Sequence, residues 1–352
     1  MKKKIFGLIL LAAVMAAIGA IYYLRQEAPR QIAVDGYLGG EKIGFLEDEE
    51  VQKILKDRYG ITADYARAGS LDMVTADLEG MDYLFPSSST ALEYYQDLHG
   101  APERSEIILN TPIVLYTHRI VLDAFEEQGI ARQQEGVWYL DMAELTALIE
   151  AETPWSQIGL PQLYGTISVD TTDPSRSNSG NMFEALLANV LNGGEVVTAE
   201  ALPKILPRLQ AIFANLGYME TSSSDLFSQF LRMGVGAKPL IAGYESQLIE
   251  YAAENPTQWE SMQEDIVMVY PTPTLWSAHV LISLDEKGTA FLEALLDEEL
   301  QTLAWEKHGF RTGSYLAPEG SDTGNLPGVA DSLTQITQIP TYEVMREMIQ
   351  EL

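Results

Sequence analysis

The chain has 352 residues with 22 basic against 51 acidic side chains, a formal net charge of −29, and it contains no cysteine. A surface this acidic repels nucleic acid and anionic lipid, so we expect no nucleic-acid partner. The lack of cysteine excludes disulfides, thiol catalysis and a lipid-modified N-terminal cysteine, while 46% hydrophobic residues suffice for a large packed core.

Residues 1–24 have the pattern of an export or anchoring segment. Lys2-Lys3-Lys4 precedes an uncharged run over residues 5–24, which at about 1.5 Å per residue can span a bilayer core of roughly 30 Å. The lysines predict a cytoplasmic N-terminus. A signal peptide cleaved near Ile18-Gly19-Ala20 is the alternative. The unbroken run favours a retained single-pass anchor, with a tether to residue 30, and both alternatives place residues 31–352 outside the cytoplasm.

Strand, polar turn and helix alternate three times over residues 31–99. Strands are expected at 31–35, 61–66 and 83–85, and they lead into the turns Gly39-Gly40, Gly69-Ser70 and 87–90. This alternation predicts a mostly parallel sheet flanked by helices. Because ligands of such sheets bind beyond the carboxyl ends of the strands, the three turns are expected to converge on one edge.

Two long apolar segments divide the rest of the chain into lobes. Residues 107–118 are long enough to leave one lobe and enter the other, and residues 266–271 provide the return crossing. Two such crossings are what a hinge needs. We therefore expect a first lobe of residues 31–115 plus 272–352 and a second lobe of residues 116–271.

The second lobe contains a hydroxyl-rich tract at residues 171–180. It follows an expected strand at 164–170 and precedes a helix whose apolar residues recur every three or four positions until Gly193-Gly194. The free amides at the start of such a helix can receive an anion or a small polar ligand. Asn178 or Ser179 could instead simply cap the helix. The position of the tract, opposite the three turns of the first lobe, favours a ligand-binding wall.

Hydroxyls and backbone amides are the expected ligand-binding groups, because fixed neutral dipoles can hold a dehydrated oxyanion. Tyr244 would be a lid or a further donor. Glu245 favours a cationic or amphoteric ligand if it faces the cleft, and could equally anchor its neighbours. Asp173 and Arg176 favour ligands of opposite charge, so the charge preference stays open. The predicted ligand-binding residues are Ser70, Ser87, Ser88, Ser89, Thr172, Asp173, Ser175, Ser177, Ser179, Gly180, Tyr244 and Glu245.

The order of these segments resembles that of bacterial extracellular solute-binding proteins of the type II periplasmic-binding fold, in particular the molybdate- and sulfate-like oxyanion binders. The resemblance covers residues 31–315. It rests on Gly69-Ser70, on residues 87–90 and 172–180, and on Tyr244-Glu245-Ser246; residues 269–274 and Gly309-Phe310-Arg311 add to it. It implies an α/β fold of two lobes joined by hinge strands, a ligand in the interlobe cleft, and delivery to an ABC-type permease. A retained membrane anchor would depart from this pattern.

Enzyme chemistry has little support in the sequence. The four histidines are scattered without metal-ligand spacing, and no nucleophile stands beside a recognisable base. We therefore expect no catalytic residues, metal or cofactor, and a monomeric protein. The predicted function is capture of a small oxyanion-like or polar solute outside the cytoplasm and its presentation to a transporter. The alternative is a membrane-anchored sensing or accessory subunit that uses the same two-lobed fold without transport.

Overall fold

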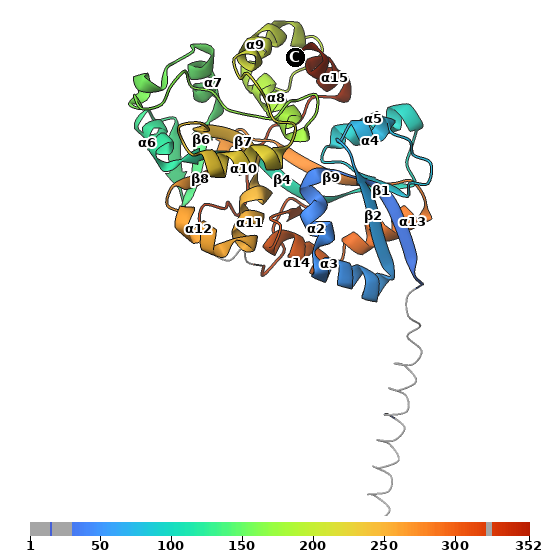
Figure 1. Cartoon of the computed structure of the whole chain (residues 1–352). Coiled ribbons are helices and arrows are strands. Elements are labelled where there is room, and N and C mark those ends of the chain that lie inside the picture. The colour runs from blue at the N-terminus through green and yellow to red at the C-terminus, as the bar shows by residue number, and fades with distance from the viewer. Residues whose placement is uncertain (1–14, 16–29, 322–325) are drawn as a thin grey trace, which may run out of the picture.

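The computed structural model describes residues 15, 30–321 and 326–352. They form two α/β lobes that share one long strand, β4 (Arg104–His118) (Figure 1). Apart from Met15, the predicted N-terminal segment at residues 1–24 lies outside the described residues. Within the described ranges, no helix combines the length and the apolar character needed to cross a bilayer.

The first lobe lies on the right in Figure 1. Besides the first half of β4, its elements are β1 (Ile32–Leu38), η1 (Gly40–Lys42), α2 (Ile43–Glu47), α3 (Glu49–Ile54), η2 (Leu55–Tyr59), β2 (Ile61–Arg67), α4 (Asp72–Thr75), β3 (Tyr83–Phe85), α5 (Ser89–His99), β9 (Trp276–Ser283), α13 (Glu286–Leu295), α14 (Glu298–Glu306) and β10 (Arg311–Thr312). The predicted threefold alternation of strand, turn and helix is confirmed. β1 pairs in parallel with both β2 and β3, so the turns that follow these strands meet at one edge.

The second lobe is built on the other half of β4. Its elements are α6 (Arg119–Glu127), β5 (Ala131–Gln134), β6 (Val137–Asp141), α7 (Met142–Glu150), η3 (Trp155–Ile158), α8 (Asn178–Leu191), α9 (Leu202–Ala214), α10 (Ser223–Met233), β7 (Leu240–Tyr244), α11 (Glu245–Glu254), α12 (Pro256–Met262), β8 (Ile266–Thr272) and α15 (Tyr342–Glu351). The helix expected after the hydroxyl-rich tract is α8.

The sheets are mixed, which corrects the prediction of mostly parallel sheets. β4 runs antiparallel to β9 in the first lobe and to β7 and β8 in the second, whereas β6 and β8 are parallel. A strand that leaves one lobe and the strand that returns to it run in opposite directions. Antiparallel pairing therefore follows from the double crossing itself. The strand expected at 164–170 is also wrong: the segment joins the sheet only at Asp170, which bridges to Ile241.

The two crossings between the lobes lie side by side. β4 pairs with β9 as far as Pro112, opposite Trp276. At the next residue the backbone N–H of Ile113 donates to the Leu275 carbonyl at 2.9 Å, and the Thr274 hydroxyl donates to the Ile113 carbonyl at 2.6 Å. The predicted return crossing at 266–271 is instead β8, a strand of the second lobe. The chain crosses back just after it, at Thr274-Leu275, and lies there beside the outgoing strand, which is the geometry of a hinge.

The C-terminal tail departs from the predicted lobe boundary. Val344, Met345 and Met348 of α15 are buried in the core of the second lobe, and Figure 1 shows this helix beside α9 at the top of that lobe. Leu326 and Ala330 pack in a second cluster of the same lobe. The prediction that all of 272–352 belongs to the first lobe therefore fails for the tail, because its apolar face matches α8 and α9.

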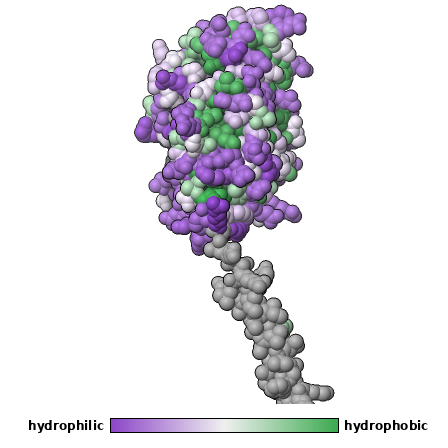
Figure 2. Space-filling model, turned by 90° about the vertical axis from the view of Figure 1, so that its right-hand side faces the viewer, coloured by the Kyte–Doolittle hydropathy of each residue, from purple (hydrophilic) through white to green (hydrophobic). Residues whose placement is uncertain are grey.

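The outer surface is largely hydrophilic. On the face seen in Figure 2, hydrophilic side chains surround smaller apolar patches. The large apolar side chains are instead concentrated in separate cores on each side of the hinge. Each lobe thus has its own main core, while a further cluster brings Trp305 of α14 together with residues of the second lobe.

Candidate ligand-binding cleft

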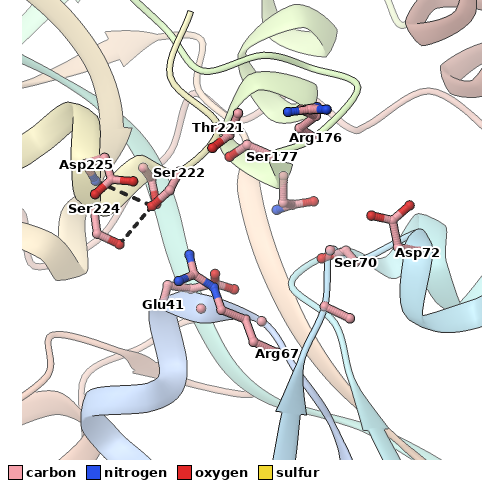
Figure 3. Close-up of a pocket in the computed structure, with 16 residues that line it drawn as sticks. Glu41, Arg67, Ser70, Asp72, Arg176, Ser177, Thr221, Ser222, Ser224 and Asp225 are labelled. Carbon is pink, nitrogen blue, oxygen red and sulfur yellow. Dashed lines mark hydrogen bonds between the residues drawn. The ribbon is translucent and has the colours of Figure 1, made fainter. Parts of the chain in front are cut away.

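A polar cleft of about 480 Å³ lies between the lobes (Figure 3). Both lobes supply its walls through loops and helix starts rather than through the middle of any element. The lining residues of the first lobe are Gly39, Gly40, Glu41, Arg67, Ala68, Gly69, Ser70 and Asp72; those of the second are Arg176, Ser177, Asn178, Thr221, Ser222, Ser223, Ser224 and Asp225.

The first-lobe wall is formed where β1 and β2 end. Leu38 and Arg67, the last residues of these parallel strands, are direct partners in the ladder, and the Ala68 N–H continues the pairing to the Leu38 carbonyl at 3.1 Å. After each strand the chain turns into the cleft at glycine, at Gly39-Gly40 after β1 and at Gly69 after β2. Ser70 closes the wall from behind, because its hydroxyl accepts the Ser87 N–H at 2.9 Å.

The second-lobe wall consists of two helix starts held next to each other. Ser177 is the N-cap of α8 and Ser222 the N-cap of α10. The loops before them are joined, since the Asp173 N–H donates to the Glu220 carbonyl at 2.8 Å. The Ser177 hydroxyl makes no capping bond and instead lies 3.0 Å from the Ser179 hydroxyl. The first amides of α8 therefore remain available to a ligand.

Gly180 keeps the α8 wall close to its own loop. A β-carbon at this position would lie 2.3 Å from the Thr172 carbonyl oxygen and 2.9 Å from the Pro174 nitrogen, and both are backbone atoms that cannot rotate away. We predict that Gly180→Ala lowers the free energy of unfolding by about 1–3 kcal/mol through overpacking. Urea denaturation measures this. Gly236→Ala, where a β-carbon meets no atom within 4 Å, is the matched control and should change stability far less.

A buried polar cluster forms the floor of the cleft. The Lys42 ammonium group is fully buried and contacts Glu41 Oε1 at 2.8 Å, Ser87 Oγ at 2.7 Å and His279 Nδ1 at 3.1 Å. Burial lowers the pKa of Lys42, an effect that the Glu41 carboxylate partly offsets. Burial and the neighbouring lysine hold the pKa of His279 well below its ordinary value. The Lys42 ammonium group thus offsets the negative charge of the Glu41 carboxylate from beneath the cleft.

Asn178 joins the lobes at the back of the cleft. Its amide donates to the Ser87 carbonyl of the first lobe and to the Tyr244 hydroxyl of the second, both at 3.0 Å. Tyr244 is buried, and burial raises the pKa of its hydroxyl. Tyr244 therefore supports Asn178 from behind rather than lining the cleft.

The predicted ligand-binding residues fall into three groups. Ser70 and Ser177 line the cleft. Ser87, Thr172, Ser179 and Tyr244 are buried directly behind its walls; Ser88 caps α5, Ser89 is its first residue, and Gly180 packs on Thr172. Asp173 and Ser175 bond to each other beside a different cavity, and Glu245 is held in a buried ion pair with Arg311.

Sequence reasoning missed most of the charged lining. Arg67 and Asp72 belong to neither a motif nor a hydroxyl tract, and they meet the second lobe only in the folded chain. The stretch Thr221-Ser222-Ser223-Ser224 carries the same signal as residues 171–180, hydroxyls before a helix, and could have been found by the same argument.

The solved structures that this chain resembles include binding proteins for small solutes and ions. The chain superimposes on a periplasmic thiamin-binding protein (TM-score 0.60, 12% identity, covering 92% of this chain and 98% of the other). The chain has the type II periplasmic-binding fold. Two further matches are the apo ferric ion-binding protein A of Pasteurella haemolytica (0.57, 15%, 90% and 94%) and a sulfate-binding protein of Mycobacterium tuberculosis (0.54, 13%, 90% and 96%). No family model and no curated protein sequence matches the chain.

The cleft offers binding groups rather than a visible catalytic apparatus. The Ser87 hydroxyl lies beside the Lys42 amine, but both side chains are fully buried below the cleft floor. Across the described ranges, no group of His, Asp or Glu side chains is placed to hold a metal ion. What the walls provide is hydroxyls, backbone amides and isolated charges contributed by both lobes.

Proposed function

We propose that this protein captures a small polar or oxyanion-like solute outside the cytoplasm and presents it to a membrane transporter, without catalysis. The observation that supports this proposal most strongly is the polar cleft, because its two walls belong to different lobes. A narrow hinge joins these lobes. A solute that contacts both walls is bound more tightly when the lobes close, so it shifts the protein toward the closed form.

The lining favours a ligand without a large apolar or aromatic part. The described side chains around the cleft include serine, threonine, asparagine, arginine and carboxylates, but no aromatic ring and no histidine. Stacking on a flat ring system therefore lacks a platform. The same lining lacks the thiolate, thioether and imidazole ligands that many transition metals prefer. Small hydrophilic molecules fit this chemistry best.

We further propose that the uncharged run at residues 5–24 tethers the protein to the outer face of the cytoplasmic membrane. A tether keeps the ligand-loaded form close to its membrane partner and so raises the effective concentration of that partner. The partner we propose is an ABC-type permease, in keeping with the fold.

Ligand screening by thermal unfolding of the purified chain tests the proposed function. One class of small polar solutes should raise the melting temperature, because a ligand at 100 times its Kd stabilises the folded state by about 2.7 kcal/mol. Ser224→Trp should abolish the rise by filling the cleft from its second-lobe wall. Ser261→Trp, on an exposed position of α12, is the control and should keep it. Binding that survives Ser224→Trp would contradict the site.

A further inference from the structure

The cleft presents free charges of both signs on both lobes. Arg67 and Asp72 come from the first lobe, and Arg176 and Asp225 from the second. Their four side chains have no ion pair or side-chain hydrogen bond with any described residue, and Figure 3 shows them spread around one space. Glu41, the remaining charged lining residue, is already paired with Lys42 at 2.8 Å. Two cationic and two anionic side chains are therefore unpaired among the described residues, and their net charge is zero.

Arg67 marks the end of the cleft that suits an acidic group. A β-carbon at Gly40 would lie 2.9 Å from both Nε and Nη2 of Arg67, so the guanidinium rests on bare backbone at the end of β1. From there it reaches toward Ser222 and Ser224 of the opposite wall (Figure 3). A planar guanidinium held in this way can bind a carboxylate, phosphonate or sulfonate through two parallel hydrogen bonds.

Asp72 marks the end that suits an ammonium group. A β-carbon at Gly69 would lie 2.9 Å from Asp72 Oδ2 and 3.8 Å from the carbonyl oxygen of Arg176. A carboxylate of the first lobe and a backbone carbonyl of the second thus face the same small region. An ammonium group has three donors and no acceptor, so it can use oxygens from both lobes at once.

Ligands with charge of only one sign meet an unfavourable partner in this cleft. An inorganic dianion would gain the guanidinium of Arg67 but would face the free carboxylates of Asp72 and Asp225, while a simple cation would face two guanidiniums. Like charges brought together in a binding site act against the wrong ligand.

We propose that the cleft binds a small organic zwitterion, whose acidic group pairs with Arg67 and whose ammonium group lies between Asp72 and the Arg176 carbonyl. This inference rests on the proposed function, since it names the class of solute that the cleft captures. Contacts at both ends involve both lobes, so a zwitterion that spans the cleft favours closure more than either of its halves.

The test compares whole zwitterions with their halves. Isothermal titration calorimetry and thermal unfolding of the full chain are carried out with α-, β- and γ-amino acids and with aminophosphonates and aminosulfonates of the same lengths. The half-ligands are propionate and propylamine, and the inorganic probe is sulfate. We expect at least one zwitterion to bind at least tenfold more tightly than propionate, propylamine and sulfate do.

Two variants test which end of the cleft binds the acidic group and which binds the ammonium group. Arg67→Gln and Asp72→Asn should each weaken binding of the zwitterion about 10- to 100-fold, the usual loss for one charge-assisted hydrogen bond. Both residues are exposed on the cleft wall, so their melting temperatures without ligand should stay near that of the parent protein. Arg232→Gln, at an exposed position of α10 outside the cleft, is the matched control and should bind like the parent.

The outcomes separate this inference from the proposed function. Sulfate or propionate binding as tightly as every zwitterion, or an Asp72→Asn variant with unchanged affinity, would overturn the zwitterion while leaving solute capture in place. If a broad screen of small polar solutes together with these probes produced no binding at all, the proposed function itself would fail and this inference with it.

Discussion

Glu245→Gln is expected to lower the free energy of unfolding by about 3–5 kcal/mol, because it leaves a buried guanidinium without its counter-charge. Arg311 Nε and Nη2 lie 2.7 Å from the two Glu245 oxygens, and neither side chain is exposed. The Tyr270 hydroxyl also donates to Glu245. Arg311 donates further to the carbonyls of Ala330 and Asp331. Urea denaturation followed by circular dichroism gives the measurement.

Two controls make this prediction specific. Glu299→Gln removes a partner of Arg58 at the surface, where both side chains are exposed, and should change stability little because water screens such pairs. The double variant Glu245→Met with Arg311→Met should lose less than Glu245→Gln alone, since it leaves no buried charge unpaired. A Glu245→Gln variant with the denaturation midpoint of the parent would contradict the role of the ion pair.

Glu184→Gln is expected to stabilise the protein progressively as the pH rises above the ordinary pKa of a glutamate side chain. Glu184 is fully buried in the middle of α8, and neither of its carboxyl oxygens has a hydrogen-bond partner in the described structure. Burial raises its pKa well above the ordinary value. The folded protein therefore holds a proton that the unfolded chain releases above a pH of about 4.3.

The sign follows from this difference in proton binding. The stabilising contribution of neutral Glu184 is complete below the pKa of the unfolded state and is lost as the pH rises toward the folded-state pKa. The cost approaches about 1.4 kcal/mol per pH unit in that window. Glutamine does not titrate, so the gap in unfolding free energy between variant and parent should widen with pH. Glu200→Gln, at an exposed position, is the control; parallel pH profiles for parent and Glu184→Gln would refute the prediction.

The parts of the fold that could be predicted are those encoded by neighbouring residues. The alternation of strand, turn and helix before residue 99 is local, and so is the apolar run that became β4. The hydroxyl-rich tract before α8 was recognised because a helix start has a sequence signature. These signals placed one wall of the cleft and the turns of the other.

The parts that could not be predicted depend on pairs far apart in the chain. Glu245 was predicted as a ligand-binding residue because no residue near it in the sequence indicates that it forms a buried ion pair with Arg311. No motif in the sequence marks Arg67, and only the approach of the second lobe makes it a cleft residue. The tail after residue 326 carries an apolar face without any sign of which lobe it covers.

The adjacency of the two crossings has a mechanical consequence. β4 and the return segment are hydrogen-bonded to each other at Ile113, Thr274 and Leu275, so they bend together and resist being sheared apart. We expect any relative motion of the lobes to be close to a rotation about this connection. A ligand that closed the cleft would then change the angle between the lobes, and a partner that contacts both lobes would respond to that angle without touching the ligand.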